Sequence, residues 1–375
     1  MYRNNLIAIV IFLVAIGLII VFSSSILQGG EFGGSIVFFK QLLWVSLALL
    51  AMWLTAKIDY HRVIRFAPYI LGIAVVLLLA VLVPGIGVHK HGAQRWIRSG
   101  PLGFQPSEVA KLAAVIFATW WLCRNRHRMK SLVWVFGVLM ALAGGLAGLL
   151  LLEPDFGTAV LIIGVVTGIG VLAGMRLWPL IPALVAAMPA AYILVWMEPY
   201  RRDRVLAFLD PWKNMDGAGY QLVQSLIALG SGGLTGLGLG ESRQKLGYLP
   251  MASNDFVFSI LGEELGFLGA VLVIVLFAAF VWNGMRAAKS APDLEGFLLI
   301  NGVTLVIGLQ ALINLCVVTG LMPTKGISLP FISSGGSSLV IFMCAVGLML
   351  NAVGQCREES PGIIPIDIGF HAVGE

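Results

Sequence analysis

Ten long apolar runs constrain what this chain can fold into more than any other feature of its sequence. A helix rises about 1.5 Å per residue, so roughly 20 apolar residues are needed to cross the hydrocarbon core of a bilayer. Of the 375 residues, 59% are apolar and 11% are charged, and the mean hydropathy is +0.94. The pattern predicts an all-α polytopic membrane protein with about ten transmembrane helices. The runs lie near residues 6–27, 36–54, 66–83, 107–122, 131–152, 158–174, 177–197, 256–282, 297–319 and 337–354.

The charges of the chain follow a membrane topology rather than a nucleic-acid surface. The net charge is +5, but the cations lie in short loops between the apolar runs. An even number of spans places both termini on one side. The positive-inside rule makes that side the cytoplasm, because twelve cations fall there and four in the short loops opposite. The inside cations are Arg3, Lys57, Arg62, Arg65, Arg124, Arg126, Arg128, Lys130, Arg176, Arg286, Lys289 and Arg357, and the outside cations are Lys90, Arg95, Arg98 and Lys325.

A single transmembrane domain is predicted over residues 1–355, with a cytoplasmic tail over 356–375. The first run is longer than the roughly 7–15 apolar residues of a signal peptide, so we interpret it as an uncleaved span. The cysteines have no metal-ligand spacing, which favours apolar packing and predicts no metal site. They are Cys123, Cys316, Cys344 and Cys356.

Residues 198–255 form a long polar segment that the topology places outside the cell. Within it, "YQLVQSLIALG" (220–230) has apolar residues toward one side and Gln221, Gln224 and Ser225 toward the other. This pattern predicts a helix in the outer membrane interface, with a tight loop packed on the bundle as the alternative. The segment also holds six cations on the side where the topology rule asks for few, namely Arg201, Arg202, Arg204, Lys213, Arg243 and Lys245.

The glycine-rich stretch in this segment is "GSGGLTGLGLGES" (230–242). It lacks the Gly-Lys-Ser/Thr ending of a phosphate-binding loop and has no flanking βαβ unit, so a phosphate-binding loop of the usual kind is not predicted. A flexible loop whose N–H groups approach a lipid headgroup stays open.

Charged residues near the start of the fourth run give a second candidate region. Glu108 and Lys111 lie three residues apart, so they share a helix face. They either line a cavity or hold helices together, because charges within membrane spans are usually functional or paired. Ser107 is expected to cap this helix.

Two further stretches join apolar runs on the outer side. In "EPDFGTA" (153–159), Asp155 is expected to cap the helix that begins near Thr158. The stretch "PTKGISLPFISSGGSS" (323–338) is broken by Pro and Gly at membrane depth, which is tolerated only against protein or a water-filled cavity. We expect it to line a cavity to which Lys325 offers a cation.

Three acids lie where the eighth run begins, in "DFVFSILGEELG" (255–266). Glu263 follows Asp255 by eight residues, about 12 Å along a helix, so the two cannot act on one bond. Glu263 and Glu264 are expected to pair with cations or helix ends. Asp255 is either a helix-start acid favoured by the dipole or a general base beside outer-loop cations.

Taken together, these stretches resemble the SEDS (shape, elongation, division and sporulation) family of peptidoglycan polymerases. The resemblance covers nearly the whole chain. The short "GLGLGESRQKL" is more similar to the FtsW branch and its sporulation relatives than to the RodA branch. The motifs include "GAQRWIRSGPLGFQPSEVAKLA", "EPDFGTA", "YRRDRVLAFLDPW", "DFVFSILGEELG" and "GISLPFISSGGSS".

The resemblance implies a glycosyltransferase that joins lipid II units at the outer face of the bacterial cytoplasmic membrane, in wall synthesis for cell division, cell shape or sporulation. It implies Asp255 as the essential acid. The chain departs from the family just before Asp255, where Met251 to Asn254 replace a stretch that usually contains Glu and His. The substrate-binding residues that we expect are Arg243, Gln244, Lys245, Arg201, Arg204, Lys111, Glu108, Lys325 and Ser337.

The resemblance also implies partners: lipid II, a class B penicillin-binding transpeptidase, other division or elongation proteins and membrane lipid, but no nucleic acid. It implies no certain cofactor, with a divalent cation (Mg or Mn) left open. Two other classes of function stay open. A lipid-linked precursor flippase would show inverted repeats and helices broken at the midplane, whereas the interruptions here cluster at the outer face. A non-catalytic division scaffold is compatible with the loss of the usual Glu and His.

Overall fold

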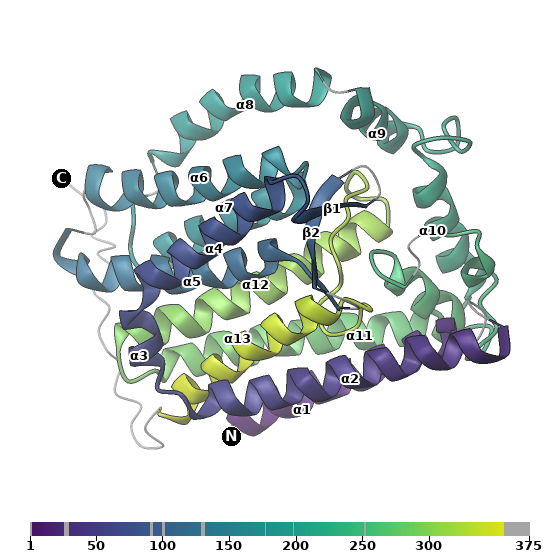
Figure 1. The fold of residues 1–375 in the computed structure, drawn as a ribbon, viewed down its shortest axis with the longest axis horizontal. Helices are drawn as coiled ribbons and strands as arrows, with labels where there is room; N and C mark the ends of the chain where they lie inside the picture. Colours follow the sequence, from purple (N-terminus) through teal and green to yellow (C-terminus); the bar gives the residue numbers. More distant parts are fainter. Residues whose placement is uncertain are drawn as a thin grey trace, which may run out of the picture.

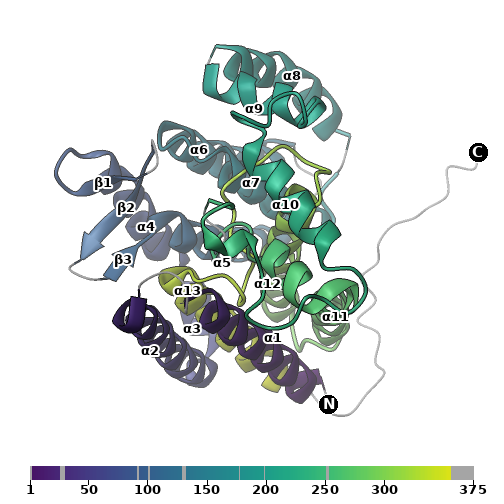
Figure 2. The same cartoon turned by 90° about the vertical axis from the view of Figure 1, so that its right-hand side faces the viewer.

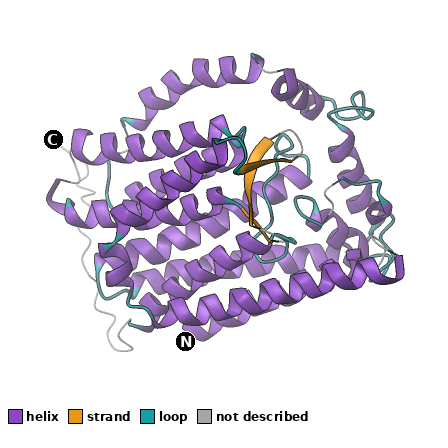
Figure 3. Ribbon diagram, viewed as in Figure 1, coloured by secondary structure: helices purple, strands orange, loops and turns teal. Residues whose placement is uncertain are grey.

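The computed structural model describes residues 2–25, 30–90, 93–99, 102–128, 132–176, 178–197, 199–250 and 253–355. Long helices dominate these residues, and each of the ten predicted apolar runs contains one (Figures 1 and 3). The all-α fold class is therefore confirmed. The ten helices are α1 (Tyr2–Ser25), α2 (Gly30–Lys57), α4 (Ala67–Leu82), α5 (Pro106–Arg124), α6 (Val138–Leu152, extended at its start by the π-helix Leu132–Gly137), α7 (Phe156–Leu172), α8 (Leu180–Trp196), α11 (Val257–Lys289), α12 (Leu294–Val318) and α13 (Gly336–Gly354).

Six of these helices are long and apolar enough to cross a membrane, judged by length and composition in the described residues: Tyr2–Ser24, Ile36–Lys57, Trp134–Leu152, Val257–Lys289, Leu294–Val318 and Gly336–Gly354. Two shorter apolar helices, Ala67–Leu82 and Phe156–Leu172, lie beside them in the bundle. Large apolar side chains such as Phe12, Trp53 and Leu268 are more than half exposed, as expected for surfaces that face lipid. The protein is an integral membrane protein.

Helices α12 and α13 form the centre of the bundle and are mostly buried. Helix α12 contacts α5, α7, α11 and α13, while α2 runs along the outer side of α13 (Figure 2). Helix α8 packs chiefly against the short helix α9 (Pro199–Leu209) and stands at the edge of the bundle in both views.

Both ends of the described chain lie at the same end of the bundle, which we call the terminal end. A Cβ atom added at Gly354 would lie 3.5 Å from Nη1 of Arg3. The short helix α3 (Tyr60–Arg65) lies at this end. Its His61 bridges Asp59 at 2.9 Å and Asp293, the N-cap of α12, at 2.7 Å. The opposite end, which we call the loop end, carries α9 and residues 319–335 (Figure 1).

A three-stranded antiparallel sheet at the loop end was not predicted. It consists of β1 (Gly87–Lys90), β2 (Ala93–Ser99) and β3 (Leu102–Phe104), in the order β1-β2-β3, and it connects α4 to α5. Figure 3 shows it as a small patch among helices. Gly103 allows β3 to approach β2, because a Cβ atom there would lie 3.2 Å from the ring of Trp96.

Helix α10 (Tyr220–Ser231) lies at the loop end, where a helix was predicted. It packs against α11 and α12. The prediction that Ser225 lies on a polar face of this helix is wrong, because Ser225 is fully buried. Its hydroxyl donates to the carbonyl of Val318 and lies 2.7 Å from Oγ of Ser259, so hydrogen bonds offset the cost of burying it.

The glycine-rich stretch packs its main chain directly against a break in α11. The N–H of Leu237 donates to the carbonyl of Glu263 at 2.9 Å. A Cβ atom at Gly236 would lie 2.1 Å from the carbonyl oxygen of Glu264, so only glycine fits. The break itself is at Gly266, whose φ of 67° is in the region that favours glycine. These glycines therefore serve close main-chain packing.

Candidate active site

Asp255 lies in the turn that leads into α11, two residues before the helix begins, and is half-buried. The amide of Asn314 on α12 donates to the carbonyl of Asp255 at 2.8 Å and to that of Ile327 at 2.6 Å. A Cβ atom at the exposed Gly326 would lie 3.0 Å from Oδ2 of Asp255. The half-buried carboxylate therefore faces residues 319–335.

The segment just before Asp255 is also held by residues 319–335. Ser333 donates its hydroxyl to the carbonyl of Asn254 at 2.6 Å, and Ser334 donates to that of Ser253 at 2.9 Å. Met251 and Ala252, which belong to the same departure from the family pattern, lie outside the described residues. The described part of this departure thus keeps a defined main-chain position.

Arg95 on β2 is a site residue that the sequence indicated only as an outer-loop cation. Its Nε donates to the carbonyl of Glu153 at 3.1 Å, and its Nη2 donates to that of Pro154. A Cβ atom at Gly326 would lie 3.8 Å from Nη1 of Arg95, so the guanidinium and the Asp255 carboxylate flank the same glycine. A short glycine-bounded run with Trp and Ile was the available signal for the strand that holds Arg95.

The surroundings of Asp255 raise its pKa toward neutral pH. Burial raises the pKa of Asp255 to about 6, the charges of Arg95 and Arg204 oppose this rise, and the charge of Asp155 reinforces it. A carboxylate with such a pKa is mostly ionised at neutral pH yet binds a proton readily, as a general base must.

Asp155 caps α7, as predicted. Its Oδ1 accepts from the N–H of Thr158 at 3.3 Å and its Oδ2 from the hydroxyl of Thr158 at 2.8 Å. In contrast, Ser107 does not cap α5. The helix begins one residue earlier, at Pro106. The buried hydroxyl of Ser107 has no hydrogen-bond partner among the described residues.

Two further predicted cations lie near the Asp255 site. Arg204 on α9 donates to the carbonyl of Thr324 at 2.9 Å. Lys325 lies with its Nζ 4.5 Å from the centre of the Phe156 ring, and burial lowers the pKa of Lys325. Arg201 lies on α9, but its side chain is outside the described part of the structure.

The other predicted residues of the outer loop surround Glu263 and Glu264. Lys245 is buried and lies 2.9 Å from Oε1 of Glu264, and its Nζ also donates to the hydroxyl of Ser23 at 3.1 Å. Glu263 accepts from the N–H of Arg243 at 3.0 Å. The expectation that both glutamates pair inside the protein is confirmed.

The orientation of the predicted loop residues differs among them. Lys245 and Gln244 are buried, whereas the side chain of Arg243 is exposed. This arrangement favours a structural role for Lys245 and Gln244, while substrate binding by any of the three stays a prediction.

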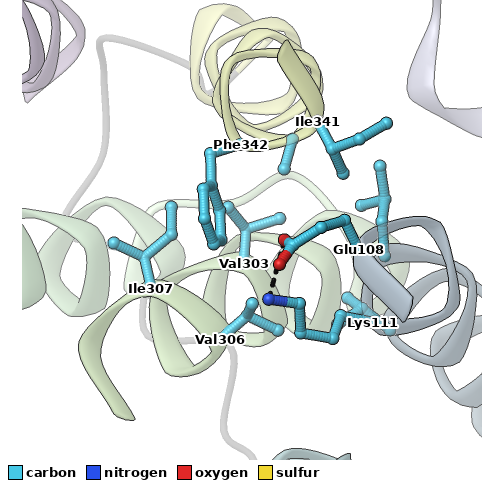
Figure 4. A pocket seen from close by; sticks show the side chains of 10 residues that line it. Glu108, Lys111, Val303, Val306, Ile307, Ile341 and Phe342 are labelled. Carbon is cyan, nitrogen blue, oxygen red and sulfur yellow. Dashed lines mark ion pairs between the residues drawn. The ribbon is translucent and has the colours of Figure 1, made fainter. Parts of the chain in front are cut away.

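Glu108 and Lys111 form a buried ion pair of 2.7 Å on α5. Figure 4 shows both side chains beside a small apolar cavity between α5, α12 and α13, with Phe342 opposite. Lys111 also donates to the side chain of Gln310 on α12, which in turn donates to the carbonyl of Ser328 at 2.9 Å. Both expected roles, lining a cavity and joining helices, are therefore present, and the pair is linked to the same segment that faces Asp255.

Ser337 lies in the first turn of α13 and is buried. Its hydroxyl has no hydrogen-bond partner among the described residues. Within the same part of the chain, no group of three or more His, Cys, Asp or Glu side chains could hold a metal ion.

The fold and the site define a polytopic helical membrane protein with a half-buried acid at the loop end, on which the charges of Arg95 and Arg204 act. The chain belongs to the FtsW/RodA/SpoVE family, described as cell cycle proteins, whose model matches residues 3–358.

Similar proteins and structures agree with this assignment. The "Probable peptidoglycan glycosyltransferase FtsW" of Geobacter sp. (strain M18) is 39% identical over 95% of this chain and 98% of its own. The "Stage V sporulation protein E" of Bacillus subtilis (strain 168) is 38% identical, over 92% and 95%.

Among solved structures, a chain described under "Structural coordination of polymerization and crosslinking by a peptidoglycan synthase complex" is similar with a TM-score of 0.79. It shares 28% identity and covers 94% of this chain and 98% of its own. The crystal structure of the rod shape determining protein RodA of Thermus thermophilus is similar with a TM-score of 0.69, 27% identity and coverage of 94% and 97%.

Proposed function

We propose that this protein is a peptidoglycan glycosyltransferase that polymerises lipid II into glycan strands at the outer face of the bacterial cytoplasmic membrane. The observation that carries the proposal is the carboxylate of Asp255, which has a pKa of about 6 and flanks an exposed glycine together with Arg95. The relatives named as peptidoglycan glycosyltransferases support it, because they match over nearly their whole length.

In the proposed reaction, Asp255 accepts the proton of the sugar 4-hydroxyl of one lipid II molecule. The hydroxyl oxygen forms a bond to the anomeric carbon of a second glycan, and the bond from that carbon to the lipid diphosphate breaks. The diphosphate leaves with the electron pair. One displacement of an α-linked diphosphate inverts the centre and gives a β-1,4 bond, so one base suffices and no covalent intermediate is needed.

The developing charge on the leaving diphosphate calls for cations near Asp255. Arg95, Arg204 and Lys325 lie there on three different elements, and fixed cations stabilise such charge without reorganisation. Arg201 and the exposed Arg243 extend the set of candidates. A divalent cation, Mg or Mn, would have to be held largely by the substrate's diphosphate, because the described residues gather no three-ligand site.

The proposed orientation places both termini in the cytoplasm and the loop end outside. The cation count of the short loops supports this, as does the shared position of both described chain ends. A class B penicillin-binding transpeptidase is the proposed partner. Its support is the structural similarity to a chain of a complex described as coordinating polymerization and crosslinking.

The proposal is tested with the purified protein and fluorescent lipid II in detergent, without any transpeptidase. Glycan ladders on a gel are the expected result. A protein that yields no ladder but moves lipid II across the bilayer of vesicles would be a flippase. One that does neither but binds division proteins would be a scaffold.

A further inference from the structure

Glu153 at the end of α6 is an acid that the proposed reaction does not use. Its exposed fraction is 0%, and neither carboxyl oxygen has a hydrogen-bond partner among the described residues. An ionised carboxylate in such a place would lose its hydration without replacement, which costs far more than burying the neutral acid. The geometry therefore disfavours the charged form of Glu153.

The charged groups around Glu153 do not reverse this preference. Arg95 faces it from β2, but this guanidinium donates to the main-chain carbonyls of Glu153 and Pro154. Asp155, two residues later, is itself an acid and would repel a second negative charge. Lys325, from residues 319–335, is directed to the ring of Phe156.

We infer that Glu153 is held as an uncharged carboxylic acid. Because Glu153 is neutral, the positive charge of Arg95 stays available to act on Asp255. Glu153 is therefore a positioning residue. The inference rests on the proposed function, because it concerns the base of that reaction. If Glu153 ionised, its negative charge would offset part of the positive charge of Arg95 and would add negative charge beside Asp155.

The pKa of Glu153 agrees with this inference. Burial raises it to about 8, Asp155 reinforces the rise and Arg95 opposes it. The acid is therefore neutral at neutral pH and ionises in the mildly alkaline range. Two pH-dependent properties follow, one of activity and one of stability.

The activity test compares the pH dependence of glycan synthesis in the natural protein and in Glu153→Gln, which keeps the shape of the neutral acid. At neutral pH the two rates should be similar, because Gln is uncharged like the neutral acid. Above about pH 8 the natural protein should slow, whereas Glu153→Gln should keep its rate. An alkaline fall of the same midpoint in both proteins would assign it to another group, such as Lys325, and overturn the inference.

The stability test does not depend on activity. Because the folded pKa is raised above the ordinary 4.5, unfolding releases this proton between about pH 4.5 and pH 8, and the natural protein loses stability over that range. The melting temperature of Glu153→Gln should therefore rise relative to that of the natural protein as the pH increases through this range. The exposed Glu241, replaced in Glu241→Gln, is the matched control and should show no such trend.

Infrared difference spectra between the natural protein and Glu153→Gln read the proton directly. A protonated-carboxyl stretch should be present at neutral pH and vanish in the alkaline range. Its absence at neutral pH would overturn the inference, even if glycan synthesis is observed. A protein that shows the stretch but makes no glycan at any pH would instead contradict the proposed function.

Discussion

Asp255 and Glu264 lie nine residues apart at the start of α11, and their surroundings differ in kind. Glu264 is fully buried and lies in direct contact with Lys245 and the hydroxyl of Ser23. Asp255 is half-buried and lies beside the exposed Gly326. The two arginines whose charges act on it, Arg95 and Arg204, donate hydrogen bonds to main-chain carbonyls.

The difference separates an acid that holds the fold from one that is available for chemistry. In a buried ion pair, the charge of the acid is stabilised by its partner. Removing either residue of the pair leaves the other as an uncompensated buried charge. Asp255 lies near two arginines that are themselves anchored, and their charges adjust its pKa. The motif "DFVFSILGEELG" thus supplies both kinds of acid within one short stretch.

Replacing Asp255 should have the largest effect on activity. In Asp255→Asn we expect the rate of glycan polymerisation to fall by roughly 10²–10⁴, as for other missing general bases. The melting temperature should change little, because Asn314 binds the main-chain carbonyl of residue 255 rather than its side chain. The measurement is the yield of glycan from fluorescent lipid II, beside the thermal unfolding of the same preparation.

Asp210→Asn is the matched control, since Asp210 is also an acid of the loop end but pairs with the exposed Lys213. It should polymerise at the natural rate. Near-normal polymerisation by Asp255→Asn would remove Asp255 from the chemistry.

Breaking the buried pair should mainly affect folding. Lys245→Ala leaves Glu264 charged and buried, which costs about 3–5 kcal/mol of unfolding free energy for pairs of this kind. Thermal unfolding in detergent measures the loss. In the double variant Lys245→Met/Glu264→Leu, part of the stability should return because no charge is left behind.

Lys213→Ala removes an exposed partner and serves as the control, with little expected change in melting temperature. If Lys245→Ala unfolds normally but uses lipid II poorly, then Lys245 binds substrate, as the sequence predicted.

Local spacing made part of this comparison predictable. Asp155 lies three residues before Thr158, and Glu108 three before Lys111, so a cap and an intrahelical pair follow from helix geometry alone. The ten apolar runs likewise each located a helix, and in the described residues six of these helices are long and apolar enough to cross a membrane.

Local sequence spacing could not predict the contacts that distinguish Asp255 from Glu264. Arg95 comes from a strand 160 residues before Asp255, and Ser23 lies 241 residues before Glu264. Pairing over such separations depends on how the helices pack, which no local pattern encodes. Ser225 shows the same limit, since its buried position depends on Ser259 and on the carbonyl of Val318.

Removing Arg95 should shift the pH dependence of the reaction. In the natural protein we expect activity to be lost as the pH falls through about 6, where Asp255 becomes protonated. The charge of Arg95 lowers the pKa of Asp255, so Arg95→Gln should raise that pKa and move the acidic limb to higher pH. Arg202→Gln removes an exposed arginine of the same end and should leave the limb in place. An unshifted limb in Arg95→Gln would mean that Asp255 does not feel this charge.

The smallest effect is expected from replacing Arg243. This replacement tests whether the region around Glu264 also contacts the substrate. Its N–H binds Glu263, and Arg243→Ala keeps that main-chain bond, so the melting temperature should stay unchanged. The lost side chain is exposed. An exposed charge acting on a diphosphate is worth up to about 1 kcal/mol, so the KM for lipid II should rise by no more than about fivefold with kcat unchanged. Initial rates over a range of lipid II concentrations separate the two constants. A fall in kcat of a hundredfold or more would place Arg243 at the reacting diphosphate and join the two regions into one site.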